Sequence, residues 1–418
     1  MHKFLTLTGL LLAAPALAVA SARAADLPGA PAPQPAPPPT NAYLLNLLFT
    51  GEGWDNTQGG LRTGAAFMYN MDAQFQADTG KAFGWTGGTF VAEAYFTNAT
   101  SFGNQYIGAV DQQSPIDTAS NMAMFHLYQL YYDQIYGGTD VRFGIYDLET
   151  EFSTTKPMAL FLSKNLTWNT AFDQAGTMPQ NGTVGPGNYP YTPLAVRVRQ
   201  DLTKNFSVQF AVANGAADNP NNLANTAVMF SPNYGAMFIG EADYTPDKYT
   251  KLMAGAWDLT AKLPEYGEYN ADGSQRMIWN QAGAYIGGAA RLYSPAPKRG
   301  LDAFLTFGAS APQSTNVAES LNGGLVYTGL FDFRPADKVG VSFNINEASN
   351  GWRQYMAAQG LMSYASESSF EVTYRAKINE YLTIQPDIQY IVNSGYNQNL
   401  KNPLALGIHF EIGHVFEW

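Results

Sequence analysis

The sequence predicts an all-β fold: a transmembrane antiparallel β-barrel of about sixteen strands. Three observations support this fold class. Apolar and polar residues alternate over segments of up to roughly fifteen residues. The polar positions hold mostly amides, hydroxyls and glycines, and the chain ends in an aromatic residue, Trp418. Strands that cross a bilayer need about ten tilted residues, whereas a strand of a globular protein has about five or six.

The first 24 residues predict a secretory signal peptide. Lys3 provides a short basic region, an uncharged apolar run extends from Phe4 to Val19, and Ala22 and Ala24 provide small residues for cleavage. A membrane anchor is the alternative, but the run is shorter than the roughly 20 residues that a spanning helix needs. We therefore expect residues 1–24 to be removed during export.

A proline-rich segment follows the signal peptide. Residues 25–40 include the run PGAPAPQPAPPP, and proline at nearly every second position excludes helix and favours polyproline II. This composition predicts a periplasmic tether that contacts peptidoglycan or other periplasmic components, and a disordered tail is the alternative. Residues 42–49 fit a short helix or a strand. We expect residues 41–418 to form one barrel domain.

The alternation is clearest from Leu61 onward. Between Leu61 and Phe75 one parity holds apolar residues such as Phe67, and the other holds polar residues such as Asp72. About fifteen segments of this kind precede the C-terminus, and bacterial barrels have an even number of strands, so we expect sixteen. Turn signals such as residues 334–337 separate neighbouring segments.

The composition restricts the function. The chain of 418 residues has 23 Lys+Arg, 34 Asp+Glu, a formal net charge of -11 and no cysteine. A nucleic-acid partner would need clustered basic residues, and thiolate metal sites and disulfides need cysteine. The sequence contains no G-x-S-x-G, H-E-x-x-H or P-loop motif. We therefore expect no nucleic-acid binding, no metal, no cofactor, no catalytic residue and no enzymatic activity.

The longest break in the alternation runs from Leu148 to Pro190. It is rich in proline and glycine and contains Trp168. A long loop in a large barrel can fold inward and narrow the lumen, and an exposed extracellular loop is the alternative. We expect an inward constriction loop, with Trp168 as a ring for sugar stacking. Other long connections are expected near residues 101–125, 214–235, 262–278 and 346–366.

Charged and amide side chains on the polar parity are candidates for the substrate pathway. Arg142, Arg197 and Arg199 are expected to point into the lumen from neighbouring strands, because a charge in the lipid face is unfavourable by up to about 4 kcal/mol. The arginines lie beside the acidic stretch Asp147, Glu149 and Glu151, which predicts a basic cluster opposite carboxylates at the constriction. Salt bridges that tie the long loop to the wall are the alternative for this cluster, a lipid-facing position is the alternative for the other charged candidates, and loop packing is the alternative for Trp168. The full set is Arg142, Asp147, Glu149, Glu151, Trp168, Arg197, Arg199, Glu93, Glu241, Asp243, Glu371, Arg375, Asp387 and Gln389.

Several short motifs, in the correct order, resemble those of the carbohydrate-selective porin family (OprB-like). The resemblance extends over most of the chain from about residue 51 to residue 418, although the last residue is Trp rather than Phe. The motifs are Gly59-Gly-Leu-Arg62, which is expected to open the first strand, Gly144-Ile-Tyr-Asp-Leu-Glu-Thr-Glu-Phe152, Tyr189-Pro190 before Ala195-Val-Arg197, Gly329-Leu-Phe-Asp-Phe-Arg-Pro-Ala-Asp-Lys-Val-Gly340, and Glu371-Val-Thr-Tyr-Arg375 followed by Tyr381-Leu-Thr-Ile-Gln-Pro-Asp-Ile-Gln-Tyr390.

The resemblance implies a porin in the outer membrane of a Gram-negative bacterium, through which neutral sugars such as glucose diffuse passively. A lumen for sugars must offer both donors and acceptors, and arginine, carboxylate and amide side chains supply them. The expected partners are permeating sugars, membrane lipid and, through the C-terminal aromatic strand, the barrel-assembly machinery. A less selective porin, an outer-membrane barrel enzyme and a secreted sugar-binding β-sandwich are the alternatives. Both a monomer and a trimer fit the sequence.

Overall fold

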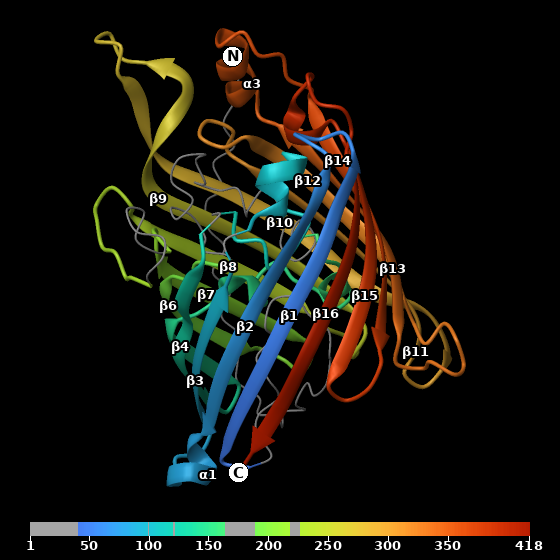
Figure 1. Cartoon of the computed structure of the whole chain (residues 1–418). Coiled ribbons are helices and arrows are strands. Elements are labelled where there is room, and N and C mark those ends of the chain that lie inside the picture. Colours follow the sequence, from blue (N-terminus) through green and yellow to red (C-terminus); the bar gives the residue numbers. More distant parts are fainter. Residues whose placement is uncertain (1–40, 99, 120–121, 164–188, 218–225) are drawn as a thin grey trace.

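The computed structural model describes residues 41–98, 100–119, 122–163, 189–217 and 226–418. In this part of the chain sixteen antiparallel strands form one closed barrel, in which β1 pairs with β16 (Figure 1). The predicted fold class is confirmed. The strands are β1 (Tyr43–Gln58), β2 (Gly64–Asp78), β3 (Gly88–Thr97), β4 (Met124–Tyr136), β5 (Thr139–Ile145), β6 (Leu194–Asp201), β7 (Phe206–Asn214), β8 (Ala236–Tyr244), β9 (Lys251–Tyr269), β10 (Gln275–Ala296), β11 (Arg299–Ser310), β12 (Val317–Thr328), β13 (Lys338–Ala348), β14 (Ser366–Lys377), β15 (Leu382–Val392) and β16 (Leu404–Glu417).

The helices are short and lie in the connections between strands. Within the described ranges, none is long and apolar enough to cross a membrane. The helical elements are α1 (Thr79–Phe83) between β2 and β3, α3 (Asn350–Ala358) between β13 and β14, and the single turns η1 (Gly103–Ile107), η2 (Leu148–Thr150), η3 (Met158–Leu160) and η5 (Ser394–Tyr396).

The two ends of the barrel differ. Tyr43 and Trp418 exchange backbone hydrogen bonds of 3.1 and 3.2 Å, so both ends of the described chain lie at one end of the barrel. Mostly short turns join the strands there, whereas the opposite end has long loops (Figure 1). Outer-membrane barrels have short periplasmic turns and long extracellular loops. We therefore call the end with Trp418 periplasmic and the other end extracellular.

The height of the barrel wall also varies around its circumference. β5 has 7 residues and β6 has 8, whereas β9 has 19 and β10 has 22. The long β9–β10 hairpin extends beyond the other strands at the extracellular end of the barrel (Figure 1). Much of the connection expected at residues 262–278 is therefore strand, which is a correction to the sequence prediction.

The alternation sorts side chains between lipid and lumen as the sequence predicts. On β7, Phe210 is exposed on the outer face and Gln209 is buried inside. On β14, Phe370 is exposed outside and Glu371 is buried inside. Successive residues of a strand face opposite sides, so this division holds along each strand. The outer surface is accordingly apolar and the lumen is polar.

The N-terminal end of the barrel differs from the sequence interpretation. Residues 42–49 begin β1, so the motif at residues 59–62 connects β1 with β2 and does not open the first strand. Gly59 and Gly60 both have positive φ, 65° and 64°. A Cβ atom would lie 2.3 Å from a backbone oxygen of a neighbouring loop at Gly59 and 2.4 Å from one at Gly60. This turn therefore needs glycine at both positions.

The seam between β1 and β16 is tightly packed. Trp54 lies opposite Gly407 in the strand register and is buried. A Cβ atom on Gly407 would lie 2.5 Å from the Trp54 ring. At the periplasmic end, the Tyr43 ring lies 6.0 Å from Phe75 and 5.8 Å from Trp418. The C-terminal aromatic residue thus joins the first two strands of the barrel.

Substitution of Gly407 tests the packing of this seam. Gly407→Ala forces the buried Trp54 ring to move, and overpacking of this kind destabilises by about 1–3 kcal/mol. We expect the folded band on a detergent gel to disappear at a lower temperature than in the wild type. The matched control is Gly53→Ala, whose Cβ atom would lie 3.6 Å from Ile408, an ordinary contact. Equal unfolding temperatures for the two variants would contradict this packing argument.

The predicted turn at residues 334–337 joins β12 to β13 at the periplasmic end. The Asp337 carboxyl accepts hydrogen bonds from the Arg334 guanidinium at 2.6 Å, the Tyr374 hydroxyl at 2.6 Å and the Lys377 N–H at 3.1 Å. Burial alone would raise the pKa of Asp337, but these hydrogen bonds outweigh it and hold the pKa below its usual range. The ionised carboxylate therefore stabilises the folded barrel at neutral pH.

The Asp337→Asn variant should be less stable than the wild type at neutral pH, and the difference should shrink in acid. The pKa of Asp337 is lower in the folded protein, so its stabilisation is fully present above the unfolded pKa, about 4, and is lost as pH falls through the folded value. Urea unfolding followed by tryptophan fluorescence at pH 7, 5 and 3 measures this difference. A difference that stays constant over this range would show that the carboxylate charge has no part in it.

Candidate functional site

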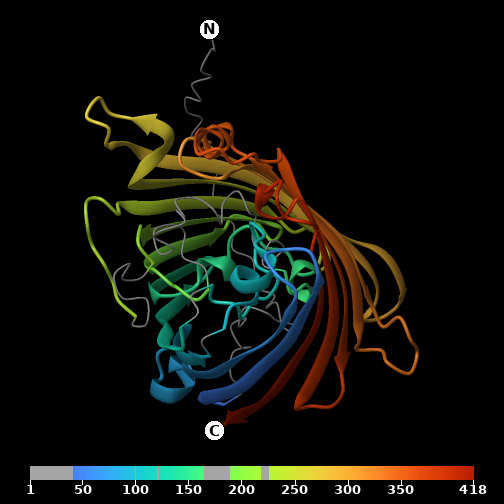
Figure 2. The same ribbon diagram turned by 45° about the horizontal axis from the view of Figure 1, so that its top comes forward.

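Two connections fold into the lumen and narrow it (Figure 2). The first inner loop, residues 101–119, buries Phe102 completely. The second inner loop comprises residues 146–163 and 189–193, and it buries Phe161 completely. The inward fold expected for the long loop is confirmed for its described part, whereas the inward fold of the first inner loop was not predicted. Trp168 lies outside the described residues.

Arg142 and Arg197 form the centre of a charge cluster on the lumen wall. They lie opposite each other on β5 and β6. Arg142 is 2.7 Å from Asp133 and 3.4 Å from Glu151. Arg197 is 2.8 Å from Glu151 and 2.9 Å from Asp140. Two guanidinium groups thus tie Glu151 of the second inner loop to the wall.

Arg199 is the most accessible of the three predicted arginines. Its side chain is 40% exposed, against 8% for Arg142 and 2% for Arg197. It donates to the Ser207 hydroxyl at 3.0 Å and lies 3.6 Å from Asp201. Arg199 is therefore placed to meet a solute, whereas the other two arginines are built into the wall.

Two predicted glutamates hold the second inner loop through its backbone. The Glu371 carboxylate accepts from the N–H groups of Leu162 at 2.7 Å and Ser163 at 3.1 Å. The Glu241 carboxylate accepts from the Ser153 N–H at 2.6 Å. Both glutamates are buried. Hydrogen bonds to charged groups are stronger than neutral ones, so these two contacts anchor the loop.

A third glutamate, which was not among the predicted residues, anchors other loops in the same way. Glu367 on β14 accepts from the Val110 N–H at 3.1 and 3.0 Å and from the Gly395 N–H at 2.6 Å. It therefore joins the first inner loop to the loop before β16. Glu367 lies four residues before Glu371 and so shares its parity. The period-two pattern could have identified it.

The remaining acidic candidates near β3 and β4 are also structural partners. Glu93 accepts from the side-chain amides of Gln74 at 2.6 Å and Gln129 at 2.8 Å. Asp147 accepts from the Tyr128 hydroxyl at 2.6 Å. Both carboxylates are buried. They make hydrogen bonds with neutral donors, and Asp147 does not join the arginine cluster as its place in the sequence had suggested.

Glu149 lies in the second inner loop, whereas Asp243 lies in the wall, on β8. The Glu149 N–H donates to Asp147 at 2.8 Å, and its side chain is buried beside that residue. Asp243 lies 3.1 Å from the Lys251 ammonium, which is also 3.2 Å from Glu241. A lysine therefore balances the carboxylate pair on β8.

The candidates on β14 and β15 link the wall to the first inner loop and to β16. The Gln389 amide donates to Asp387 at 3.0 Å and to the backbone oxygen of Gln113 at 2.8 Å. Arg375 binds Glu411 with two hydrogen bonds, of 3.2 and 2.5 Å. Of these side chains, Asp387 and Gln389 are buried, and Arg375 is partly accessible.

A hydrogen-bond network across the seam between β1 and β16 was also not predicted. His409 Nδ1 lies 2.7 Å from Glu52, and His409 Nε2 lies 3.2 Å from Glu411. The indole N–H of Trp54 donates to Glu52 at 2.6 Å. The network therefore extends from β1 through β16 to Arg375 on β14. Glu52 was not identified because the first strand had not been recognised.

A closed barrel with an apolar outer face and a polar lumen narrowed by inner loops defines an outer-membrane porin. A family model described as "Carbohydrate-selective porin, OprB family" matches residues 62–413. The chain belongs to this family, and it is therefore an outer-membrane protein of Gram-negative bacteria.

Individual relatives agree with this assignment. The chain is 24% identical to Porin B of Pseudomonas aeruginosa over 416 residues, which cover 88% of this chain and 87% of the relative. The high-pH structure of Pseudomonas putida OprB is 20% identical, with a TM-score of 0.78 over 89% of this chain and 94% of that chain. The outer membrane channel DcaP of Acinetobacter baumannii is 9% identical, with a TM-score of 0.52 over 89% and 97%. These structures share the barrel fold.

Loss of the Glu371 anchor should widen the lumen. Glu371→Gln replaces a charged acceptor of two backbone N–H groups, and hydrogen bonds to charged groups contribute about 1.5–3 kcal/mol each. We expect a larger single-channel conductance in planar bilayers and faster protease cleavage within the second inner loop. The control is Glu319→Gln at the exposed start of β12. An unchanged conductance and cleavage rate would exclude an anchoring role for Glu371.

Proposed function

We propose that this porin admits neutral monosaccharides, such as glucose, by passive and selective diffusion. The observation that carries the proposal is the pairing of the lumen arginines with carboxylates. Each arginine at a lumen-facing position of the described strands lies within 4.0 Å of a carboxylate. These arginines are Arg142, Arg197, Arg199, Arg291 and Arg375.

Pairing of this kind favours uncharged polar solutes over anions. A paired guanidinium attracts an anion weakly, because the neighbouring carboxylate opposes it. The accessible side chains of the lumen, such as Arg199 and Glu151, offer donors and acceptors together. A sugar can exchange hydrogen bonds with such a lining as it loses water, and each contact stays weak enough for the sugar to leave.

The proposed solute contacts are the accessible members of the predicted set. Arg199 is the first, and Glu151, with a side chain 14% exposed, lies on the same stretch of wall. Arg375 is 11% exposed. The buried candidates act on the solute indirectly, because they hold the inner loops that set the width of the lumen. Trp168 stays a prediction as a stacking ring.

The proposal also covers catalytic activity, export, periplasmic contacts and barrel assembly. The family is one of channels, and we extend this to the absence of catalytic activity. We also propose that residues 1–24 direct export and are removed, that residues 25–40 make periplasmic contacts, and that the strand ending at Trp418 is recognised by the barrel-assembly machinery. The aromatic packing of Trp418 against the first two strands supports the last point.

Swelling of proteoliposomes tests the selectivity. We expect faster swelling with glucose than with amino acids of similar size, and slower swelling with larger sugars. Equal rates for all small solutes would indicate a general porin instead. Absence of swelling would contradict an open channel. Migration of the unheated protein on a detergent gel first verifies that the barrel is folded.

Two arginine variants then separate solute contact from structure. Arg199→Gln should keep the folded barrel and lower the ratio of glucose to amino acid flux. Arg197→Gln should instead destabilise the barrel, because it removes the buried guanidinium that binds Glu151 and Asp140, and loss of one partner of a buried ion pair is unfavourable by about 3–5 kcal/mol. A flux ratio that does not change in folded Arg199→Gln would remove Arg199 from the pathway.

A further inference from the structure

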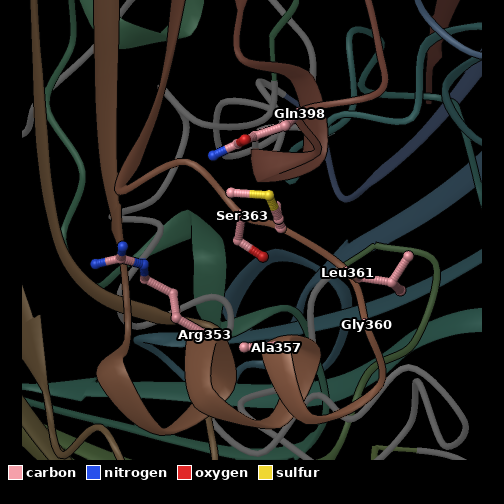
Figure 3. A pocket seen from close by; sticks show the side chains of 7 residues that line it. Arg353, Ala357, Gly360, Leu361, Ser363 and Gln398 are labelled. Carbon is pink, nitrogen blue, oxygen red and sulfur yellow. The ribbon is translucent and has the colours of Figure 1, made fainter.

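A pocket at the extracellular end of the barrel lies between α3 and the loop before β16 (Figure 3). Its volume is about 380 Å³, within the range of sites for small organic ligands. The Arg353, Ser363 and Gln398 side chains line this pocket, with the Arg353 guanidinium at one side of it and Gln398 at the other. Ala357 and Leu361 add apolar surface to the lining. This pocket is separate from the charge cluster on β5 and β6.

The end of α3 builds one side of the pocket. Gly360 has a φ of 78°, its N–H donates to the Ala357 oxygen at 3.0 Å, and the Leu361 N–H donates to the Met356 oxygen at 3.0 Å. This pair of bonds is a Schellman motif, which reverses the chain after a helix. The segment after Gly360 therefore returns alongside the last helical turn, and the pocket forms between them.

Contacts with other elements hold the pocket in place. Tyr355 of α3 packs on Tyr266 of β9, with ring centroids 5.5 Å apart. Ser363 forms a β-bridge with Asn397, next to Gln398. Helix, returning segment and loop are thus fixed relative to one another, so the polar groups are arranged before a ligand arrives.

Arg353 is the unusual member of the lining. Its Nε atom is buried and has no hydrogen-bond partner. Among the described residues, no carboxylate lies within 4.0 Å of its guanidinium, whereas the arginines of the lumen are all paired. The pocket lining contains neither Asp nor Glu. A guanidinium left unmatched in an open pocket favours a planar anion that can accept two hydrogen bonds.

We propose that this pocket is a docking subsite for monosaccharides that carry a carboxylate, such as uronic acids. The carboxylate binds the Arg353 guanidinium, the Ser363 hydroxyl and the Gln398 amide bind sugar hydroxyls, and Ala357 and Leu361 contact the C–H face. The inference rests on the proposed function, because a sugar held here would enter the lumen. It extends the proposed solutes from neutral sugars to acidic ones, which the pocket binds before they enter the lumen.

Ligand binding to the purified full-length protein in detergent tests the subsite without transport. Saturation-transfer NMR would be recorded with glucuronate, glucose and inorganic phosphate. We expect saturable glucuronate binding, and about tenfold weaker binding to Arg353→Gln, as for loss of about 1.4 kcal/mol. Arg353→Lys should bind several-fold more weakly than the wild type, because lysine lacks the two-pronged donor. Glucose signals should not change in either variant.

The matched control is Arg276→Gln, an exposed arginine of the β10 extension that is paired with Glu265. It should bind glucuronate like the wild type. Equal binding by the wild type and both Arg353 variants would overturn the subsite, as would equal loss in Arg276→Gln. Binding of phosphate but not glucuronate through Arg353 would also overturn it, in favour of a phosphate site. If Arg353→Gln does not fold, Arg353→Lys decides.

Glucose swelling separates this inference from the proposed function. Normal glucose flux with glucuronate binding independent of Arg353 would refute the subsite alone. Glucuronate binding that depends on Arg353, in a protein that does not pass glucose, would refute the proposed function and leave the pocket as a binding site.

Discussion

Backbone hydrogen bonding in the absence of water is the constraint on which the rest of this structure depends. A bilayer offers no partner to an unpaired N–H or C=O group, so a sheet that crosses it must close. The pairing of β1 with β16, from Leu44 opposite Glu417 to Gln58 opposite Leu404, meets this requirement. Once the register is fixed, the face of every side chain follows, because a shift of one residue would turn the polar face toward lipid.

Closure of the barrel creates a second requirement inside it. Inner loops that enter the lumen bring backbone N–H groups away from bulk water, and these groups need acceptors. The wall supplies them as carboxylates: Glu371, Glu241 and Glu367 each accept from loop N–H groups. Acidic residues of the lumen therefore shape the passage mainly as supports for the loops. Few of the predicted side chains, such as Arg199, remain accessible.

The sequence predicts the barrel well because its signal is local. Period-two alternation identifies the faces of β7, β13, β14 and β16 directly. The first strand cannot be recognised in this way, because Leu44 and Leu48 are apolar on the lumen side. Both faces of this segment therefore look apolar in the sequence. The roles of the site residues depend on contacts distant in the chain: Leu162 and Glu371 are 209 positions apart. No spacing rule links such pairs, which explains why the inward direction of the charges and the arginine contacts with Glu151 were predicted but the backbone partners of the glutamates were not.

The unequal height of the barrel wall has a consequence for how molecules arrive. β9 and β10 exceed β5 and β6 by more than ten residues, and a strand rises about 3.3 Å per residue along its length. The rim of the barrel is therefore oblique to the barrel axis. An oblique section through a cylinder has a larger area than a perpendicular section. Such a mouth presents a wider capture target to diffusing molecules than the tube's own cross-section, while the narrow part of the passage stays the same.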